Sequence, residues 1–414
     1  MAEKEVRLRR LKTASDIARF MADYYYELDE ATKSRKRKIA WCTSVGPAEI
    51  LKSMGFLTYF PETHSALIGT RKLAADFIPS ANAIGYSPEV CSYLTSDIGA
   101  YVLGETPLAK AFPGIERIPG ADVFVYNTNQ CRDVQDWFSW YSEKFGAPLL
   151  GVETHRNVGK VTPAHVASIA SQLENMIEPL ERIAGQKFDI DELRNVVELS
   201  RQCSVLWEKC LATAAAVPAP LTFFDATTLM GPAVVGRGQQ EVLGLYERLL
   251  EELSERIERG EGATGERERF RIYWEGMPVW GRLSMHAKLF SGLGAVVIAS
   301  TYCSSWIFNA LDPAAPFESM AKAYLELFIV RSEEYKERYI REKLAFFKCD
   351  GIVYHDAKTC PNNSNCRYGM VQRIESKTSI PALVINGDLN DMRLISDEQT
   401  RTNVEAFVEQ LEEQ

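Results

Sequence analysis

The chain of 414 residues has a formal net charge of −9 at pH 7, with 46% hydrophobic and 25% charged residues. Its length favours two or three domains, and its composition is typical of a soluble globular protein. The negative charge argues against nucleic acid or an anionic membrane as the main partner, so the short Lys- and Arg-rich clusters near the N-terminus are interpreted as solvent-exposed faces.

The first part of the chain predicts a polar helix followed by strands that alternate with helices. Residues 1–37 form this N-terminal helical segment. Candidate strands occupy 38–44, 56–60, 122–126 and 148–153, and candidate helices occupy 47–55, 66–78, 87–104 and the stretch from about 131. Alternation of this kind is typical of a parallel sheet covered by helices. Residues 38–160 therefore predict a first α/β domain.

The strand signal then disappears and returns near residue 270. Residues 161–265 carry apolar side chains at helical spacing, which predicts a helical segment. Candidate strands follow at 270–276, 295–302, 351–355 and 382–387, and candidate helices at 281–293, 316–348, 363–378 and 396–413. Residues 266–414 predict a second α/β domain. The fold class is therefore α/β, with two parallel-sheet domains and a helical layer between them.

The sequence also indicates the compartment of the protein. No apolar run reaches the roughly 18 residues of a membrane span, and no apolar core follows the basic residues near the N-terminus, as a secretory signal would require. We therefore expect a cytoplasmic protein. In a reducing compartment its nine cysteines are thiols or metal ligands rather than disulfides. No CxxC pair occurs, which excludes zinc-ribbon and thioredoxin motifs.

Polar residues follow the predicted strands, at the edge where open parallel sheets bind ligands. Ser44 follows the first strand, and Glu62 and His64 follow the second. Glu62 is a candidate general base, although a surface glutamate would fit the same pattern. Asp388 and Asp391 follow the last strand and could equally be a turn and a helix cap.

Three cysteines share the setting of a predicted helix start. Cys91 comes shortly after Ser87 and Pro88, Cys131 opens the helix after a strand, and Cys360 directly precedes a proline. A helix N-terminus stabilises a thiolate, and thiolates are the ligands of iron–sulfur clusters. Two facing α/β domains would bring the three cysteines together. Their spacing fits three buried small hydrophobic residues as well.

Several stretches between about residues 38 and 410 carry a family pattern in their order along the chain. They are AWCTSVGPAEI, YFPETHSALIGTRK, GYSPEVCSYLTSDIGAY, NTNQCRDVQDWF, YWEGMPVWGRL, GIVYHDAKTC and PALVINGDLNDMRLISDEQ. In these stretches the chain resembles the catalytic iron–sulfur subunits of the 2-hydroxyacyl-CoA dehydratase and benzoyl-CoA reductase family. The resemblance implies two flavodoxin-like, truncated Rossmann-like domains around one [4Fe–4S] cluster. Cys91, Cys131 and Cys360 match the three cysteines that hold the cluster, whose fourth iron site is open.

The resemblance also implies partners. Family members work as pairs of related subunits, so a homologous second subunit is expected in a heterodimer or larger assembly. A separate ATP-hydrolysing iron–sulfur activator would deliver a low-potential electron. This agrees with the sequence, in which no GxGxxG follows a predicted strand and no GxxxxGK[ST] occurs. The implied substrate is an acyl-CoA thioester, and neither nucleic acid nor a membrane is expected.

Two residues match dehydratase positions near the substrate, Ser44 and Glu62. Cys42 departs from the pattern, because the dehydratases carry a hydroxyl residue there, and CPNNSNCRYG departs from their basic, Ser-rich stretch. CSYLTSDIG is closer to the benzoyl-CoA reductases. The resemblance therefore implies an anaerobic, radical-type enzyme, favoured as a 2-hydroxyacyl-CoA dehydratase that forms a ketyl radical and loses water syn. The alternatives are reduction of an aromatic acyl-CoA ring, a non-catalytic electron-relay partner, and a double-cubane-type reductase of small molecules.

Overall fold

The computed structural model describes residues 9–265 and 267–413 and contains two four-stranded sheets, both entirely parallel. The first has the order β2-β1-β3-β4 and the second the order β6-β5-β7-β8. Each sheet therefore repeats the flavodoxin-type order, and the predicted α/β fold class is confirmed. The strands are β1 Ile39–Cys42, β2 Leu57–Tyr59, β3 Val123–Asn127, β4 Leu149–Val152, β5 Phe270–Glu275, β6 Ala295–Ser300, β7 Gly351–Ala357 and β8 Ala382–Gly387.

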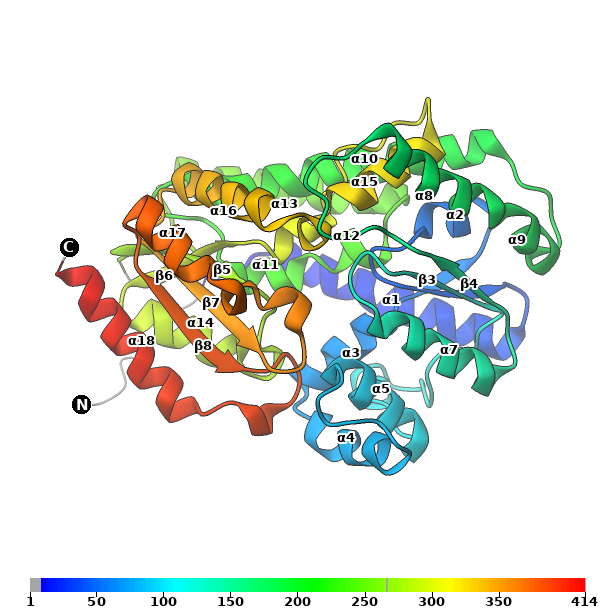
Figure 1. The fold of residues 1–414 in the computed structure, drawn as a ribbon, viewed down its shortest axis with the longest axis horizontal. Helices are drawn as coiled ribbons and strands as arrows, with labels where there is room; N and C mark the ends of the chain where they lie inside the picture. Colours follow the sequence, from blue (N-terminus) through cyan, green and yellow to red (C-terminus); the bar gives the residue numbers. More distant parts are fainter. Residues whose placement is uncertain (1–8, 266, 414) are drawn as a thin grey trace.

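Helices surround the two sheets and join them. In Figure 1 the strands β5–β8 lie at the left and β3 and β4 at the right, with helices of the middle of the chain running along the top and through the centre. The helices before β4 are α1 Thr13–Ser34, α2 Ala48–Ser53, α3 Pro61–Thr70, α4 Ala74–Ala83, α5 Ser92–Leu103, α6 Leu108–Ala111 and α7 Asp133–Phe145. The helical layer consists of α8 Pro163–Asn175, α9 Ile177–Ala184, α10 Ile190–Ala212, α11 Phe223–Leu229, α12 Gly231–Val235 and α13 Gln240–Glu258. The remaining helices are α14 Leu283–Gly292, α15 Pro316–Glu326, α16 Glu333–Phe347, α17 Met370–Thr378 and α18 Asp397–Glu412.

One continuous core crosses the molecule. Val125 of β3, Trp207 of α10 and Val353 of β7 are all fully buried in the same hydrophobic cluster. The indole N–H of Trp207 also donates to the carbonyl of Cys303 at 2.9 Å. The predicted domain limits at residues 37, 160 and 265 therefore stay a proposal, because residues on both sides of these limits pack in the same hydrophobic cluster.

Three predicted helices differ from the structure where the backbone changes direction. The helix expected at 66–78 is two helices, α3 and α4, because Lys72 between them has a left-handed φ of 60°. The helix expected at 316–348 is also two, and Ser332 caps the second by accepting from the N–H of Tyr335. The helix expected from 363 begins only at Met370, after Gly369 with a φ of 75°.

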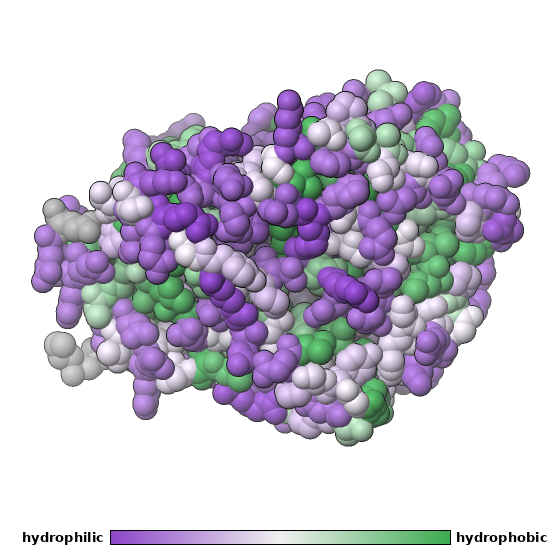
Figure 2. Space-filling view, viewed as in Figure 1, coloured by the Kyte–Doolittle hydropathy of each residue, from purple (hydrophilic) through white to green (hydrophobic). Residues whose placement is uncertain are grey.

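The face of the molecule seen in Figure 2 is largely polar. Figure 2 shows mostly hydrophilic side chains on this face, with hydrophobic groups gathered in smaller patches between them. No helix within the described ranges is long and apolar enough to cross a membrane.

Candidate active site

The carboxyl ends of both sheets open on one cavity of about 380 Å³. Ser44 follows β1, Cys131 follows β3, Met277 follows β5 and Cys360 follows β7, and all four line this cavity. In the first sheet β1 and β3 are neighbours, and in the second sheet β5 and β7 are neighbours. After each of these pairs the chain continues to opposite sides of the sheet. Such a topological switch point is where open α/β sheets bind ligands. The switch points of both sheets therefore lie at the same cavity.

All three cysteines predicted to act together line this cavity, and each is partly exposed. Their settings differ from the prediction in detail. Helix α5 begins at Ser92 with Cys91 as its N-cap, because Ser87 instead accepts the N–H of Glu89 in a preceding turn. Cys131 lies just before α7, and Cys360 precedes a 3₁₀ turn at Pro361–Asn363 rather than an α-helix.

The three cysteines share one local electrostatic setting. The backbone N–H of the residue three positions later, which is Leu94, Val134 or Asn363, lowers the pKa of the thiol in each case. The amide of Asn363 also donates to the sulfur of Cys360. These donors favour the thiolate form and lower the pKa of each thiol. The helix-start pattern in the sequence therefore corresponds to backbone N–H groups that favour the thiolate form.

Burial acts against these donors. Desolvation raises the pKa of Cys91 well above its ordinary value, and the neighbouring Cys360 and Cys131 raise it further. Burial likewise raises the pKa of Cys131 to about 12 and that of Cys360 to about 11. Three thiolates in this cavity therefore need a positively charged group between them. Iron of a cluster would supply this charge.

A single metal ion does not fit this arrangement. Across residues 9–265 and 267–413, no three His, Cys, Asp or Glu side chains come close enough to ligate one ion. The cysteines of an iron–sulfur cluster bind separate iron atoms, so they need not converge on one point. The three cysteines, their N–H donors and the volume of the cavity fit such a cluster.

Glu62 lies in the same cavity at the start of α3 and is only 8% exposed. Its Oε1 accepts the backbone N–H of Ser44 at 3.0 Å and the side-chain amide of Gln130 at 2.8 Å. Its Oε2 has no hydrogen-bond partner among the described residues. Burial raises the pKa of Glu62 to about 7 in spite of these donors. Glu62 can therefore carry or lack a proton near neutral pH.

Gln130 connects the two predicted substrate contacts, and no sequence pattern assigned it a role. Its Oε1 accepts the hydroxyl of Ser44 at 3.2 Å while its Nε2 donates to Glu62. The loop that carries Ser44 is itself fixed, since Gly46 O accepts from Arg237 at 3.0 Å and from Tyr324 at 3.2 Å. The only signal for Gln130 is its place directly before Cys131.

His64, the neighbour of Glu62 in sequence, does not reach the cavity. Its Nδ1 lies 2.5 Å from Asp97 and its Nε2 lies 2.8 Å from the hydroxyl of Thr106. The other oxygen of Asp97 accepts from Trp137 at 3.0 Å and from Tyr141 at 2.7 Å. This buried carboxylate connects α3, which carries Glu62, with α5 and α7, which follow Cys91 and Cys131.

Asp388, predicted as a turn or a cap, has a wider role in the structure. It accepts from the backbone and hydroxyl of Thr359, at 2.9 and 2.6 Å, and from the hydroxyl of Ser92. Ser92 also donates its own N–H to the hydroxyl of Thr359 at 3.0 Å. These bonds connect the immediate neighbours of Cys91 and Cys360 across the two sheets.

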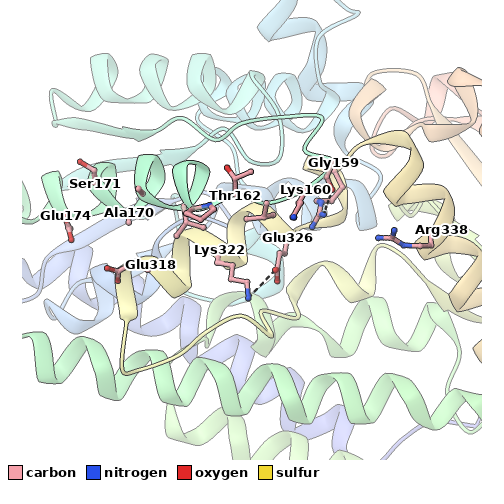
Figure 3. Close-up of a pocket in the computed structure, with 15 residues that line it drawn as sticks. Gly159, Lys160, Thr162, Ala170, Ser171, Glu174, Glu318, Lys322, Glu326 and Arg338 are labelled. Atoms are coloured by element: carbon pink, nitrogen blue, oxygen red, sulfur yellow. Dashed lines mark hydrogen bonds and ion pairs between the residues drawn. The ribbon is translucent and has the colours of Figure 1, made fainter.

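A second, larger hollow of about 940 Å³ lies at the surface between α8 and α15 (Figure 3). Lys322 and Glu326 line it and form an ion pair at 3.8 Å, and Lys160 and Arg338 lie along it. It shares no lining residue with the cysteine cavity and contains none of the predicted site residues.

Comparison with known proteins identifies the family of the chain. Residues 43–411 match the family described as 2-hydroxyglutaryl-CoA dehydratase, D-component. The chain belongs to this family, which confirms the resemblance recognised in the sequence.

The family's named relatives include both dehydratases and a reductase. The (R)-2-hydroxyisocaproyl-CoA dehydratase alpha subunit of Clostridioides difficile is 28% identical, over 95% of this chain and 94% of the relative. The alpha subunit of the lactoyl-CoA dehydratase of Anaerotignum propionicum is also 28% identical, over 92% of each chain. A benzoyl-CoA reductase subunit of Thauera aromatica is 26% identical, over 95% of this chain and 93% of the relative.

Proposed function

We propose that the chain is the [4Fe–4S] subunit of an ATP-activated, radical-type enzyme that removes water from a 2-hydroxyacyl-CoA. Cys91, Cys131 and Cys360 would hold the cluster. The observation that carries the proposal is the presence of Glu62, with a pKa of about 7 and a free Oε2, in the same cavity as these cysteines. The dehydratase subunits among the relatives support the same reaction class.

Bound to the three cysteines, a [4Fe–4S] cluster would supply an electron to the thioester carbonyl and take the electron back once water has been lost, and it would act as a Lewis acid toward the carbonyl oxygen. The remaining steps need proton transfers, which Glu62 can perform at Oε2. The neutral carboxyl gives its proton to the hydroxide that leaves C2, and the resulting carboxylate takes a proton from C3. Water is lost and Glu62 returns to its neutral form, and one carboxyl acting on one face gives syn loss.

Ser44 and Gln130 would orient these groups. The Ser44 hydroxyl lies one hydrogen bond from Gln130, and its oxygen can accept a hydrogen bond from the 2-hydroxyl of the substrate. Gln130 and the N–H of Ser44 both bind Oε1 of Glu62, which leaves Oε2 for proton transfer. A subunit that only relays electrons would not need this proton carrier beside the cysteines.

The proposal includes two partners and a place in the cell. The relatives named as alpha subunits and as a reductase subunit belong to multi-subunit enzymes, so we expect a homologous second subunit. The electron would come from a separate ATP-hydrolysing iron–sulfur activator, in an anaerobic cytoplasm. Reduction of an aromatic acyl-CoA ring is the second candidate reaction, because a benzoyl-CoA reductase subunit matches over nearly the whole chain.

The test is anaerobic purification with the co-purifying subunit, followed by iron and sulfide analysis and an assay. We expect about four iron atoms per chain, and water loss from a 2-hydroxyacyl-CoA that depends on activator and ATP. Benzoyl-CoA serves as the competing substrate. An iron-free protein under anaerobic conditions, or reduction of benzoyl-CoA without any dehydration, would overturn the proposal.

A further inference from the structure

Apolar side chains from helices and loops around both sheets form most of the wall of the cysteine cavity. The wall is built largely by side chains of α3, α5, the α11–α12 junction and the loops after β5 and β6. Its main members are Leu67, Tyr93, Met230, Val234, Trp280 and Tyr302. Some polar groups of the wall bind each other, since the indole N–H of Trp280 donates to the hydroxyl of Tyr93. The rings of Trp280 and Tyr302 pack edge to face, 6.1 Å apart.

The charged side chains in this wall have one sign. Among the described residues that line the cavity, Glu62 and Asp133 are the carboxylates, and none is Lys, Arg or His. Arg156, whose charge acts on the thiol of Cys131, is exposed. Its guanidinium donates to the carbonyl of Thr128 at 3.3 Å and to Asn362 at 2.9 Å. It is therefore held beside the cysteines and is not part of the wall.

Such a cavity discriminates between acyl groups by charge. A carboxylate at the end of an acyl chain would lose its water in this wall and find no cation to pair with. It would also be repelled by Asp133 and by the ionised form of Glu62. An apolar chain or a ring would instead remove apolar surface of both partners from water.

We propose that the substrate of this chain carries an uncharged apolar acyl group, aliphatic or aromatic, and not a dicarboxylic one. This inference rests on the proposed function, which supplies the CoA thioester. It separates the chain from the glutaryl ester for which its family is named. The wall, with its carboxylates Glu62 and Asp133, decides which acyl group enters, and the cysteines do not.

Binding of unreactive esters tests the inference without turnover. Isocaproyl-CoA and glutaryl-CoA differ in the charge of the acyl end and can be titrated calorimetrically into the anaerobically purified holoenzyme. We expect isocaproyl-CoA to bind at least about tenfold more tightly. Equal binding, or tighter binding of glutaryl-CoA, would overturn the inference even if the enzyme is a dehydratase. Selective binding without dehydratase activity would overturn the proposed function alone.

A charge introduced into the wall provides a second test of the inference. Leu67 is half-buried on α3 and lines the cavity, so Leu67→Lys introduces a cation into the wall. The preference for isocaproyl-CoA should then fall at least about fivefold relative to the wild type. Val102→Lys is the matched control, because Val102 is 43% exposed on α5 and does not line the cavity. A preference that is the same in Leu67→Lys, Val102→Lys and wild type, with iron content retained, would contradict the role of the wall.

Discussion

The hydroxyl of Ser92 donates a hydrogen bond to the carboxylate of Asp388, although the two residues are 296 positions apart. Ser92 is the first residue of α5 and follows Cys91, and Asp388 follows β8. Asp388 also accepts from Thr359, the residue before Cys360. One buried carboxylate therefore fixes the positions of two proposed cluster ligands relative to each other.

Replacing Asp388 with Asn should loosen this connection. An amide nitrogen cannot accept the hydrogen bonds that both carboxylate oxygens now receive, so at least one buried donor loses its partner. We expect the free energy of unfolding to fall by about 2 kcal/mol and the iron content per chain to drop. Both can be measured, by denaturant unfolding and by iron analysis after anaerobic purification.

Asp391→Asn is the control for Asp388→Asn. Asp391 lies in the same loop, but its carboxylate binds Arg393 and no neighbour of a cysteine. This variant should therefore keep its iron. Full iron content and an unchanged electron paramagnetic resonance spectrum in Asp388→Asn would show that the carboxylate does not position the ligands.

The ligand role of the cysteines predicts a clear contrast between two substitutions. Cys131→Ala removes a sulfur from the cavity and should abolish the visible absorbance and most of the bound iron. Cys203→Ala removes a buried sulfur in the core around α10 and should leave the iron content unchanged. It should cost about 1 kcal/mol of stability at most, because Cys203 acts there as a small hydrophobic residue. Equal iron content in both variants would exclude Cys131 as a ligand.

Glu62 predicts how the stability of the protein depends on pH. Its folded-state pKa of about 7 lies above the ordinary value of 4.5, so the folded protein binds the proton more tightly. The resulting stabilisation is fully present below about pH 4.5 and is lost as the pH rises through about 7, at a total of about 3 kcal/mol. Glu62→Gln should remove this contribution from a series of unfolding measurements between pH 4 and pH 8. An identical pH profile in the variant would contradict the raised pKa.

The same residue predicts the pH dependence of dehydration. Because the neutral carboxyl starts the proposed proton transfer, kcat should fall as the pH rises through about 7. Glu62→Gln cannot donate or accept this proton and should lower kcat by about 100-fold or more. Its iron content should stay near the wild-type value, since Glu62 is not one of the proposed ligands. Wild-type kcat in this variant would remove Glu62 from the mechanism.

Gln130 should determine the pH at which kcat falls. Its amide donates to Glu62 and lowers the pKa of the carboxyl, so Gln130→Leu should move the fall in kcat to higher pH by up to about one unit. Ser44→Ala keeps the backbone N–H that binds Glu62 and should lower kcat/KM without changing the pH at which kcat falls. An equal shift of this pH in both variants would show that Gln130 has no separate effect.

Much of the architecture followed from the sequence, because buried parallel strands are continuous apolar runs that polar residues end abruptly. Polar residues after these runs, such as Ser44 and Cys131, therefore indicated where the site would lie. Helix limits were less predictable, since the left-handed backbone at Lys72 carries no clear local signal. Gln130 was not assigned a role from the sequence, and Asp388 was expected only as a turn or a cap, because the contacts of both depend on partners brought close by packing. The ligand roles of the cysteines stay a prediction.

The place of Cys360 near the end of the chain also has a consequence for biosynthesis. Two of the three cysteines are made early, while the third and its anchor at Asp388 emerge only when the second sheet is nearly complete. A ribosome-bound chain that ends before this point lacks one of the three proposed sulfur ligands. The proposed cluster could therefore be completed only after Cys360 has emerged, and it would then connect the two sheets at a late stage of maturation.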